Sequence, residues 1–134
     1  MGNFTILRDF DLIVFSQTTN SDRAKYFYGE VLGLKFQGED PFAFSFSTGQ
    51  IVLGVQKSFQ ETPQSPFTRF GWVVPDIGAS VRELSKKGVI FEQQRGVPQD
   101  DLGIWTVRGG AKVAWFKDPD GNVLSLTQYP PDSN

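Results

Sequence analysis

The sequence contains no cysteine and no histidine among its 134 residues. Without cysteine there is no disulfide framework, no thiolate nucleophile and no zinc–thiolate site. Without histidine there is no Ser–His or Cys–His catalytic pair and no imidazole ligand for a metal ion. The two absences therefore exclude nucleophilic catalysis that depends on histidine or cysteine, and metal sites built from either residue.

The sequence also lacks a large excess of charge of one sign and any long hydrophobic run. The 13 basic and 15 acidic residues give a net charge of −2, which gives no sign of the basic footprint of a nucleic-acid-binding protein. No apolar run approaches the ~20 residues of a membrane span, and the first fifteen residues show neither a basic leader nor a small-residue cleavage site. We expect a soluble, cytoplasmic protein with no nucleic-acid and no membrane partner.

The chain consists of two halves that resemble each other. The run Phe10–Val14 is similar to Phe70–Val74, and each run is followed by a polar break. Apolar residues at helical spacing then predict a helix over Ser21–Val31 in the first half and over Ile77–Lys87 in the second.

The ends of both predicted helices carry matching signals. Asn20 or Ser21 suits the N-cap of the first helix, and Asp76 suits that of the second. Gly33 and Gly88 each stand where a helix C-terminus favours a left-handed residue.

A strand follows each of these glycines, and each half ends in a hairpin, so that each half is predicted as strand, helix, strand, strand, strand. The predicted strands after the helices are 34–37, 42–47 and 50–56 in the first half, and 89–92, 113–117 and 122–128 in the second. A long loop over 95–110 interrupts the second half. The whole chain, 1–134, is expected to form one domain, with module one at about 6–57, a linker at about 58–66 and module two at about 67–129.

Two runs in this repeat, FYGEVLGLKF at 27–36 and FKDPDGNVLSL at 116–126, are similar to motifs of the vicinal-oxygen-chelate superfamily. That superfamily includes glyoxalase I, extradiol dioxygenases, fosfomycin-resistance enzymes and bleomycin-resistance binding proteins, and the resemblance covers nearly the whole chain. It implies an α+β fold in which two tandem βαβββ modules form a curved mixed sheet around a cleft. It also implies a homodimer.

Enzymes of this superfamily hold a divalent metal on the cleft face of four strands, usually with His and Glu. The corresponding positions in this chain hold Gly54, Arg69, Ser125 and, in the first strand, Asp11, Ile13 or (if the register slips) Leu12. A catalytic metal needs about three protein ligands, and an arginine stays charged and repels a cation. We therefore expect no metal and no cofactor.

Arg69 allows two interpretations. Its planar guanidinium suits a carboxylate, phosphate or polarised oxygen of a ligand. Alternatively, it pairs with Asp11 or extends into water.

The side chains on the predicted cleft face are small and mildly polar, since this face contains Ser45, Gly54, Gly71 and Ser125. Their small size either leaves room for an organic ligand or lets the two sheets close over a collapsed cleft.

The aromatic residues divide by position. Trp72 and Trp115 share strand faces with helix-packing residues and are expected in the core. Trp105 lies in the long second-module loop, where it serves as a stacking group or lid, or else as a cap on the barrel end or a dimer contact. Phe116 is expected to face the cleft beside Ser125.

The favoured hypothesis is a metal-free small-molecule binding protein similar to the drug-sequestering proteins of bleomycin resistance. It captures a neutral or anionic aromatic organic ligand in the cleft between the modules, stacked by Trp105 and Phe116. The expected ligand-binding residues are Asp11, Ile13, Ser45, Gly54, Gln56, Arg69, Gly71, Trp105, Phe116 and Ser125.

Two alternatives remain. The first is a metal-independent lyase, isomerase or related enzyme in which Arg69 stabilises an oxyanion and Asp11 or Tyr28 acts as acid or base. Because no recognisable catalytic pair is present, its catalytic residues are unknown. The second is a non-catalytic dimerisation module with a vestigial cleft.

Overall fold

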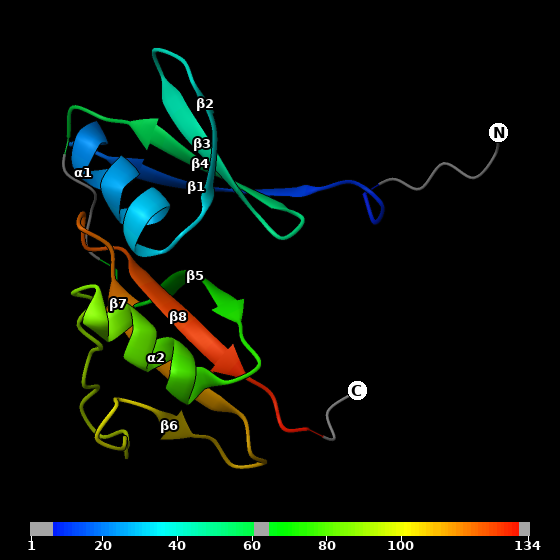
Figure 1. Cartoon of the computed structure of the whole chain (residues 1–134), viewed down its shortest axis with the longest axis vertical. Helices are drawn as coiled ribbons and strands as arrows, with labels where there is room; N and C mark the ends of the chain where they lie inside the picture. Colours follow the sequence, from blue (N-terminus) through cyan, green and yellow to red (C-terminus); the bar gives the residue numbers. More distant parts are fainter. Residues whose placement is uncertain (1–6, 61–64, 132–134) are drawn as a thin grey trace, which may run out of the picture.

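The computed structural model describes residues 7–60 and 65–131. Figure 1 shows two modules, each with its own sheet and one main helical segment. In chain order the elements are β1 (Leu12–Thr18), α1 (Ser21–Lys25), η1 (Tyr26–Val31), β2 (Lys35–Glu39), β3 (Ala43–Thr48), β4 (Ile51–Lys57), β5 (Thr68–Val73), α2 (Ile77–Lys86), β6 (Trp105–Thr106), β7 (Lys112–Lys117) and β8 (Val123–Gln128).

The two sheets have the same plan. Their strand orders are β1-β4-β3-β2 and β5-β8-β7-β6. In each sheet the first strand of the module is an edge strand that pairs in parallel, and the other pairings are antiparallel. The predicted α+β fold of two tandem modules is therefore confirmed. No helix in the described ranges 7–60 and 65–131 is long and apolar enough to cross a membrane.

The predicted helix signals act as expected. The side chain of Asn20 accepts a hydrogen bond from the backbone N–H of Arg23 at 3.1 Å, and Asp76 does the same for Ala79 at 3.1 Å. Gly33 and Gly88 adopt φ angles of 79° and 97°, a region that favours glycine because it has no Cβ. The first helix differs in one respect, since α1 continues as the π-helical η1.

The second module departs from the predicted repeat at its edge. Residues 89–92 do not form a strand, and Phe91 makes only an isolated bridge to Phe116. The side chain of Gln99 donates hydrogen bonds to the carbonyl oxygens of Glu92 (2.9 Å) and Gly103 (2.7 Å). The carbonyl of Glu92 is thus bonded to a side chain, although its N–H still donates to the carbonyl oxygen of Trp115 at 2.7 Å, and the short β6 pairs with β7 further along.

The β7–β8 hairpin corrects the expected faces of Trp115 and Phe116. Lys117 pairs with Val123, so the turn contains the five residues 118–122 rather than four. The Asp118 carboxylate accepts hydrogen bonds from the backbone N–H groups of Asp120 and Asn122, at 3.0 and 2.9 Å, and holds this longer turn. One additional residue reverses the alternation of side chains.

Phe116 therefore points into the core, where it is 0% exposed, and the expectation that it faces the cleft is wrong. Trp115 pairs with Ser125 on the opposite face, so its predicted core position is also wrong. The prediction for Trp72 holds in part: it is half-buried on the core side, where its ring stacks against Phe116.

The core lies on the helix-facing sides of both sheets and continues from one module to the other. Tyr28, on η1, lies between the sheets, with its ring 6.0 Å from Phe46 and 6.5 Å from Phe70. Figure 1 accordingly shows the first helical segment between its own sheet and the second module. The opposite faces of the two sheets, called here the outward faces, carry no helix from the described part of the chain.

Candidate functional site

The outward face of the first sheet contains four of the predicted ligand-binding residues. Pairing places Ile13 beside Val52, and Gly54 beside Ser45 and Phe15. Gln56 follows Gly54 by two residues and shares this face because alternate strand residues point the same way. The register also decides between the first-strand alternatives, since Ile13 lies on the outward face and Leu12 on the other, while Asp11 lies exposed just before β1.

Phe15 occupies the space expected to be open at Gly54. A Cβ atom added to Gly54 would lie 2.9 Å from Cδ1 and Cε1 of the Phe15 ring, so the ring lies directly against the glycine. The signal was present in the sequence, because Phe15 follows Ile13 by two residues in an uninterrupted strand. The aromatic residue nearest to Gly54 is thus one that the sequence prediction did not include.

The outward face of the second sheet centres on Ser125. Gly71 pairs with Ser125 on one side and Trp115 pairs with it on the other. A Cβ atom at Gly71 would overlap both the hydroxyl and the carbonyl oxygen of Ser125. Glycine is therefore required at this position by close packing, whatever its role toward a ligand.

Trp105 and Trp115 form a stacked pair on this outward face. Their ring centroids are 6.0 Å apart and their planes differ by 25°. Trp105 lies in β6, paired with Val113, rather than in an open loop. Asp100 supports the preceding turn by accepting hydrogen bonds from the backbone N–H groups of Leu102 and Ile104, both at 2.9 Å. Strand pairing and the supported turn thus hold Trp105 in place, so it does not lie on a free loop that could close as a lid.

Arg69 lies where the two outward faces meet. It occupies the register shift between Thr68 and Phe70, and its Nη1 atom donates to the carbonyl oxygen of Phe15 at 3.5 Å. Within residues 7–60 and 65–131 it makes no ion pair, so the predicted alternative of an Arg69–Asp11 pair is not found in a single chain. Arg69 is exposed and remains accessible to an anionic group.

The predicted site residues therefore form two groups rather than one enclosed pocket. Ile13, Ser45, Gly54 and Gln56 lie on the first outward face, and the second group contains Gly71, Ser125 and Trp105, with Arg69 between them. A cavity of about 280 Å³ between β1, β4 and β5 contains Gly71 but none of the first group; its other lining residues are Leu12, Val14, Thr48, Ile51, Leu53, Phe70 and Trp72.

The positions that would hold the superfamily's divalent metal do not fit one. Gly54 has no side chain, and the ring of Phe15 covers it. Arg69 carries a positive charge, which leaves the Ser125 hydroxyl as the only neutral oxygen donor among the three positions. No group of three or more acidic, histidine or cysteine side chains suited to a metal occurs in the described part of the chain.

Tyr28, the alternative acid or base, lies in the core rather than on either outward face. Its phenol is buried and donates a hydrogen bond of 2.6 Å to Asp118. Burial, and then the neighbouring Asp118 carboxylate, raise the pKa of Tyr28 well above its usual value. A phenol held in this way is a structural donor, and it is not available as a base at neutral pH.

Comparison of the sequence with known protein families gives one match. Residues 13–126 match the sequence model of the Glyoxalase/Bleomycin resistance protein/Dioxygenase superfamily. No curated protein matches.

Three similar solved structures illustrate the likeness. A glyoxalase/bleomycin resistance protein/dioxygenase from Alicyclobacillus acidocaldarius has 19% identity and a TM-score of 0.71, with 92% of this chain and 94% of that chain covered. A glyoxalase family protein from Bacillus anthracis has 16% identity and a TM-score of 0.70, covering 95% and 99%. TnmS3, an antibiotic binding protein from Streptomyces sp. CB03234, has 20% identity and a TM-score of 0.68, covering 94% and 100%.

Proposed function

The chain belongs to the Glyoxalase/Bleomycin resistance protein/Dioxygenase superfamily, and we propose that within it the protein is a metal-free binder of a small aromatic organic molecule. Binding is stoichiometric, in the manner of drug-sequestering proteins, and the neighbour TnmS3 is described as an antibiotic binding protein. The proposed ligand is neutral or anionic because Arg69, which contacts Phe15 of the first outward face, is exposed and makes no ion pair with a described residue. The proposal includes a cytoplasmic location for the protein.

The observation that carries this proposal is the Trp105–Trp115 pair. Two indoles with ring centroids 6.0 Å apart on a helix-free face form an aromatic cluster against which a ligand ring can pack. Ser125, paired with Trp115, supplies a hydroxyl beside this cluster. Apolar contact combined with a few placed polar groups is the usual chemistry of small-molecule sites. In this proposal Trp115, and not Phe116, stacks on the ligand together with Trp105.

A second copy of the chain completes the cleft in this proposal. The first outward face exposes apolar side chains, with Ile13 and Phe15 each 49% exposed, and Val73 of the second outward face is 67% exposed. Such contiguous apolar surface favours burial against a partner. In a two-fold homodimer the first outward face of one chain covers the second outward face of its partner, and this encloses the residues that a single chain leaves on two open faces.

The metal-independent enzyme receives less support. Arg69 is accessible enough to stabilise an oxyanion, but Tyr28 lies in the core and is committed to Asp118. Asp11 is exposed just before β1. Within the described residues no hydrogen bond or ion pair joins Asp11 to Arg69 or to Tyr28, so no acid–base pair is assembled.

Native mass spectrometry of the protein purified gently from its own host tests the proposal. We expect a dimer that carries no metal and retains an organic adduct, whose mass then identifies the ligand class. A stoichiometric divalent metal would overturn the proposal, because the Gly54, Arg69 and Ser125 positions would then have to be reinterpreted. A dimer with neither adduct nor saturable binding of aromatic anions would instead indicate the vestigial-cleft alternative.

A further inference from the structure

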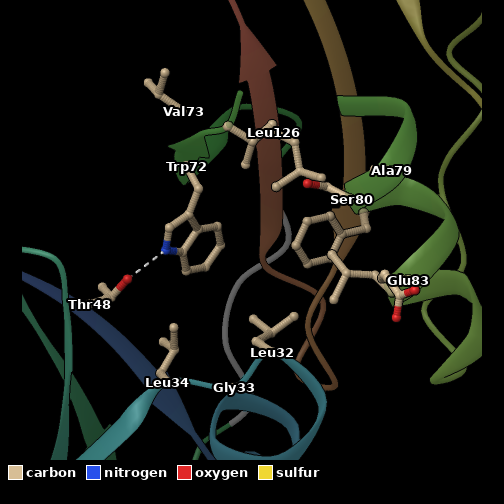
Figure 2. Close-up of a pocket in the computed structure, with 13 residues that line it drawn as sticks. Leu32, Gly33, Leu34, Thr48, Trp72, Val73, Ala79, Ser80, Glu83 and Leu126 are labelled. Carbon is tan, nitrogen blue, oxygen red and sulfur yellow. Dashed lines mark hydrogen bonds between the residues drawn. The ribbon is translucent and has the colours of Figure 1, made fainter. Parts of the chain in front are cut away.

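A larger groove lies on the other side of the second sheet, between α2 and the first module. It has a volume of about 530 Å³, within the range of sites for drug-sized molecules. Figure 2 shows the indole of Trp72 with Leu32 and Leu34 of the first module below it, and with Ala79, Ser80 and Glu83 of α2 on the right of the view. The remaining lining residues are Gly33, Thr48, Val73, Val74, Leu84, Phe116 and Leu126.

This groove is separate from the proposed ligand site. Trp72 and Leu126 pair with each other on the core side of the second sheet, whereas Gly71 and Ser125 pair on its outward face. A molecule in the groove therefore contacts the core side of the second sheet, whereas a molecule that stacks on Trp105 contacts its outward face. Neither Trp105 nor Arg69 is among the described residues that line the groove, and Val73 is the one groove residue that the proposal above also places on the second outward face.

The groove has a rigid, flat aromatic wall. The Trp72 ring lies 6.5 Å from Phe116 with only 15° between the planes. The indole N–H donates to the Thr48 hydroxyl at 3.0 Å (Figure 2), which fixes the ring's orientation across the two modules. Because Trp72 is already hydrogen-bonded and held in place, a planar ligand meets a preformed surface and loses little free energy to ordering.

The polar groups of the groove set its charge preference. Glu83 is the only charged residue among the described residues that line it. Its carboxylate forms an exposed pair with Lys86 at 3.5 Å, with the Glu83 side chain 70% exposed, and such a pair is weak enough to be exchanged for a ligand cation. Ser80 adds a hydroxyl to the groove. This hydroxyl makes no hydrogen bond to any residue that the structure describes.

We propose that this groove is a second binding site, which prefers a flat aromatic cation. The aromatic body packs against Trp72 and the leucine side chains, and the positive group lies toward Glu83 at the rim. The charge preference is opposite to that of the outward faces, where Arg69 favours a neutral or anionic molecule. The two sites are thus distinguishable by ligand charge as well as by position.

Proflavine, a flat aromatic cation, tests this proposal through fluorescence anisotropy of the dye with the full chain at low salt. The groove-filling variant is Ala79→Phe, because Ala79 is exposed on α2 and lines the groove. Ser85→Phe places the same side chain on the same helix outside the groove and serves as the matched control. We expect A79F to weaken proflavine binding by roughly tenfold or more through loss of the contact volume, while S85F binds like the wild type.

The charge component is tested by Glu83→Gln. We expect E83Q to weaken proflavine binding about threefold at low salt, with the difference disappearing at high salt as screening increases. Equal affinity in A79F and the wild type would overturn the proposal, as would the absence of saturable binding. Loss of proflavine binding in Trp105→Ala but not in A79F would place the dye on the outward face and would also overturn it. A failure of the outward-face proposal leaves the A79F result unchanged, so the two proposals fail independently.

Discussion

The phenol of Tyr28 donates a hydrogen bond of 2.6 Å to Oδ2 of Asp118, a residue 90 positions further along the chain. The bond joins the first helical segment to the β7–β8 turn of the other module. Asn122 donates to the same carboxylate oxygen at 2.8 Å and to the Ser16 hydroxyl at 3.0 Å. This buried network holds the two modules in one relative orientation, on which the position of both outward faces depends.

Removal of the phenol tests the strength of this network. In Tyr28→Phe the buried Asp118 carboxylate keeps its donors from Asn122 and the turn but loses the phenol. We expect the free energy of unfolding to fall by about 1–3 kcal/mol, the usual cost of removing one partner of a buried charged hydrogen bond. Urea unfolding measures it. Tyr129→Phe removes the hydroxyl of an exposed tyrosine and is expected to have almost no effect; equal losses in the two variants would contradict the assigned role.

The raised pKa of Tyr28 predicts a loss of stability in alkali. Its pKa in the folded protein lies above the usual value of 10.0, mainly through burial and then through Asp118. A group whose folded pKa is raised contributes stability below its unfolded pKa and loses that contribution as the pH rises through the folded pKa. We therefore expect the free energy of unfolding to decline above about pH 10, and to decline less steeply in Y28F. Urea titrations at about pH 8 and about pH 11, on either side of the unfolded pKa, give the comparison, and parallel declines in both proteins would count against this explanation.

The local part of the fold follows from the sequence because its signals lie within a few residues of one another. Asn20, Asp76, Gly33 and Gly88 mark the helix ends correctly. The hairpin of the third and fourth strands is also found, although its two-residue turn is 49–50, one residue later than the predicted 48–49. In these cases a cap or a turn residue acts on its own neighbours, so no knowledge of the tertiary structure is needed.

The sequence-based predictions are wrong where a contact with a distant residue, or an unusual local contact, determines the structure. The Asp118 side chain lengthens a turn by one residue, and this single residue exchanges the faces of Trp115 and Phe116. Gln99 bonds the carbonyl of Glu92, so that the expected strand keeps only the Phe91 bridge and the Glu92 N–H bond to Trp115. Neither effect leaves a periodic pattern in the sequence. The groove beside Trp72 was not predicted, because it is formed by residues of both modules that meet only in the folded chain.

Trp105→Ala is predicted to weaken ligand binding on the second outward face. The substitution removes one indole of the stacked pair and with it one of the two aromatic groups available to a ligand. We expect the affinity for the aromatic anion 1-anilinonaphthalene-8-sulfonate to fall about tenfold, the equivalent of ~1.4 kcal/mol for one aromatic contact. Dye fluorescence titration measures the change. The matched control, Phe59→Ala, removes a fully exposed aromatic side chain elsewhere, and an equal loss there would indicate non-specific adsorption of the dye.

Gly71→Ala is predicted to destabilise the second sheet. The new Cβ would overlap the hydroxyl and the backbone carbonyl oxygen of Ser125. Because one of these atoms is backbone, the strands have to separate, and we expect a loss of about 1–3 kcal/mol, typical of overpacking. Gly38→Ala is the control, since nothing in the described part of the chain lies within 4 Å of a Cβ at that position. Thermal unfolding followed by circular dichroism compares the two, and an unchanged midpoint for G71A would show that β5 and β8 separate at little cost.

The proposed dimer depends on the exposed apolar side chains of the first outward face. Phe15→Glu places a charge beside Gly54 at the centre of this face, where burial against a partner would leave the carboxylate without a solvent shell or a counter-ion. We expect the variant to be monomeric in analytical ultracentrifugation and to retain no organic adduct, because the cleft requires the partner's face. Tyr26→Glu introduces the same charge at another exposed aromatic position, 63% exposed and on the helical segment η1 rather than on an outward sheet face, and is expected to leave the dimer intact. A dimeric F15E protein would show that the chains associate through a different surface, whereas a monomer that still binds the ligand would show that one chain's second outward face is sufficient.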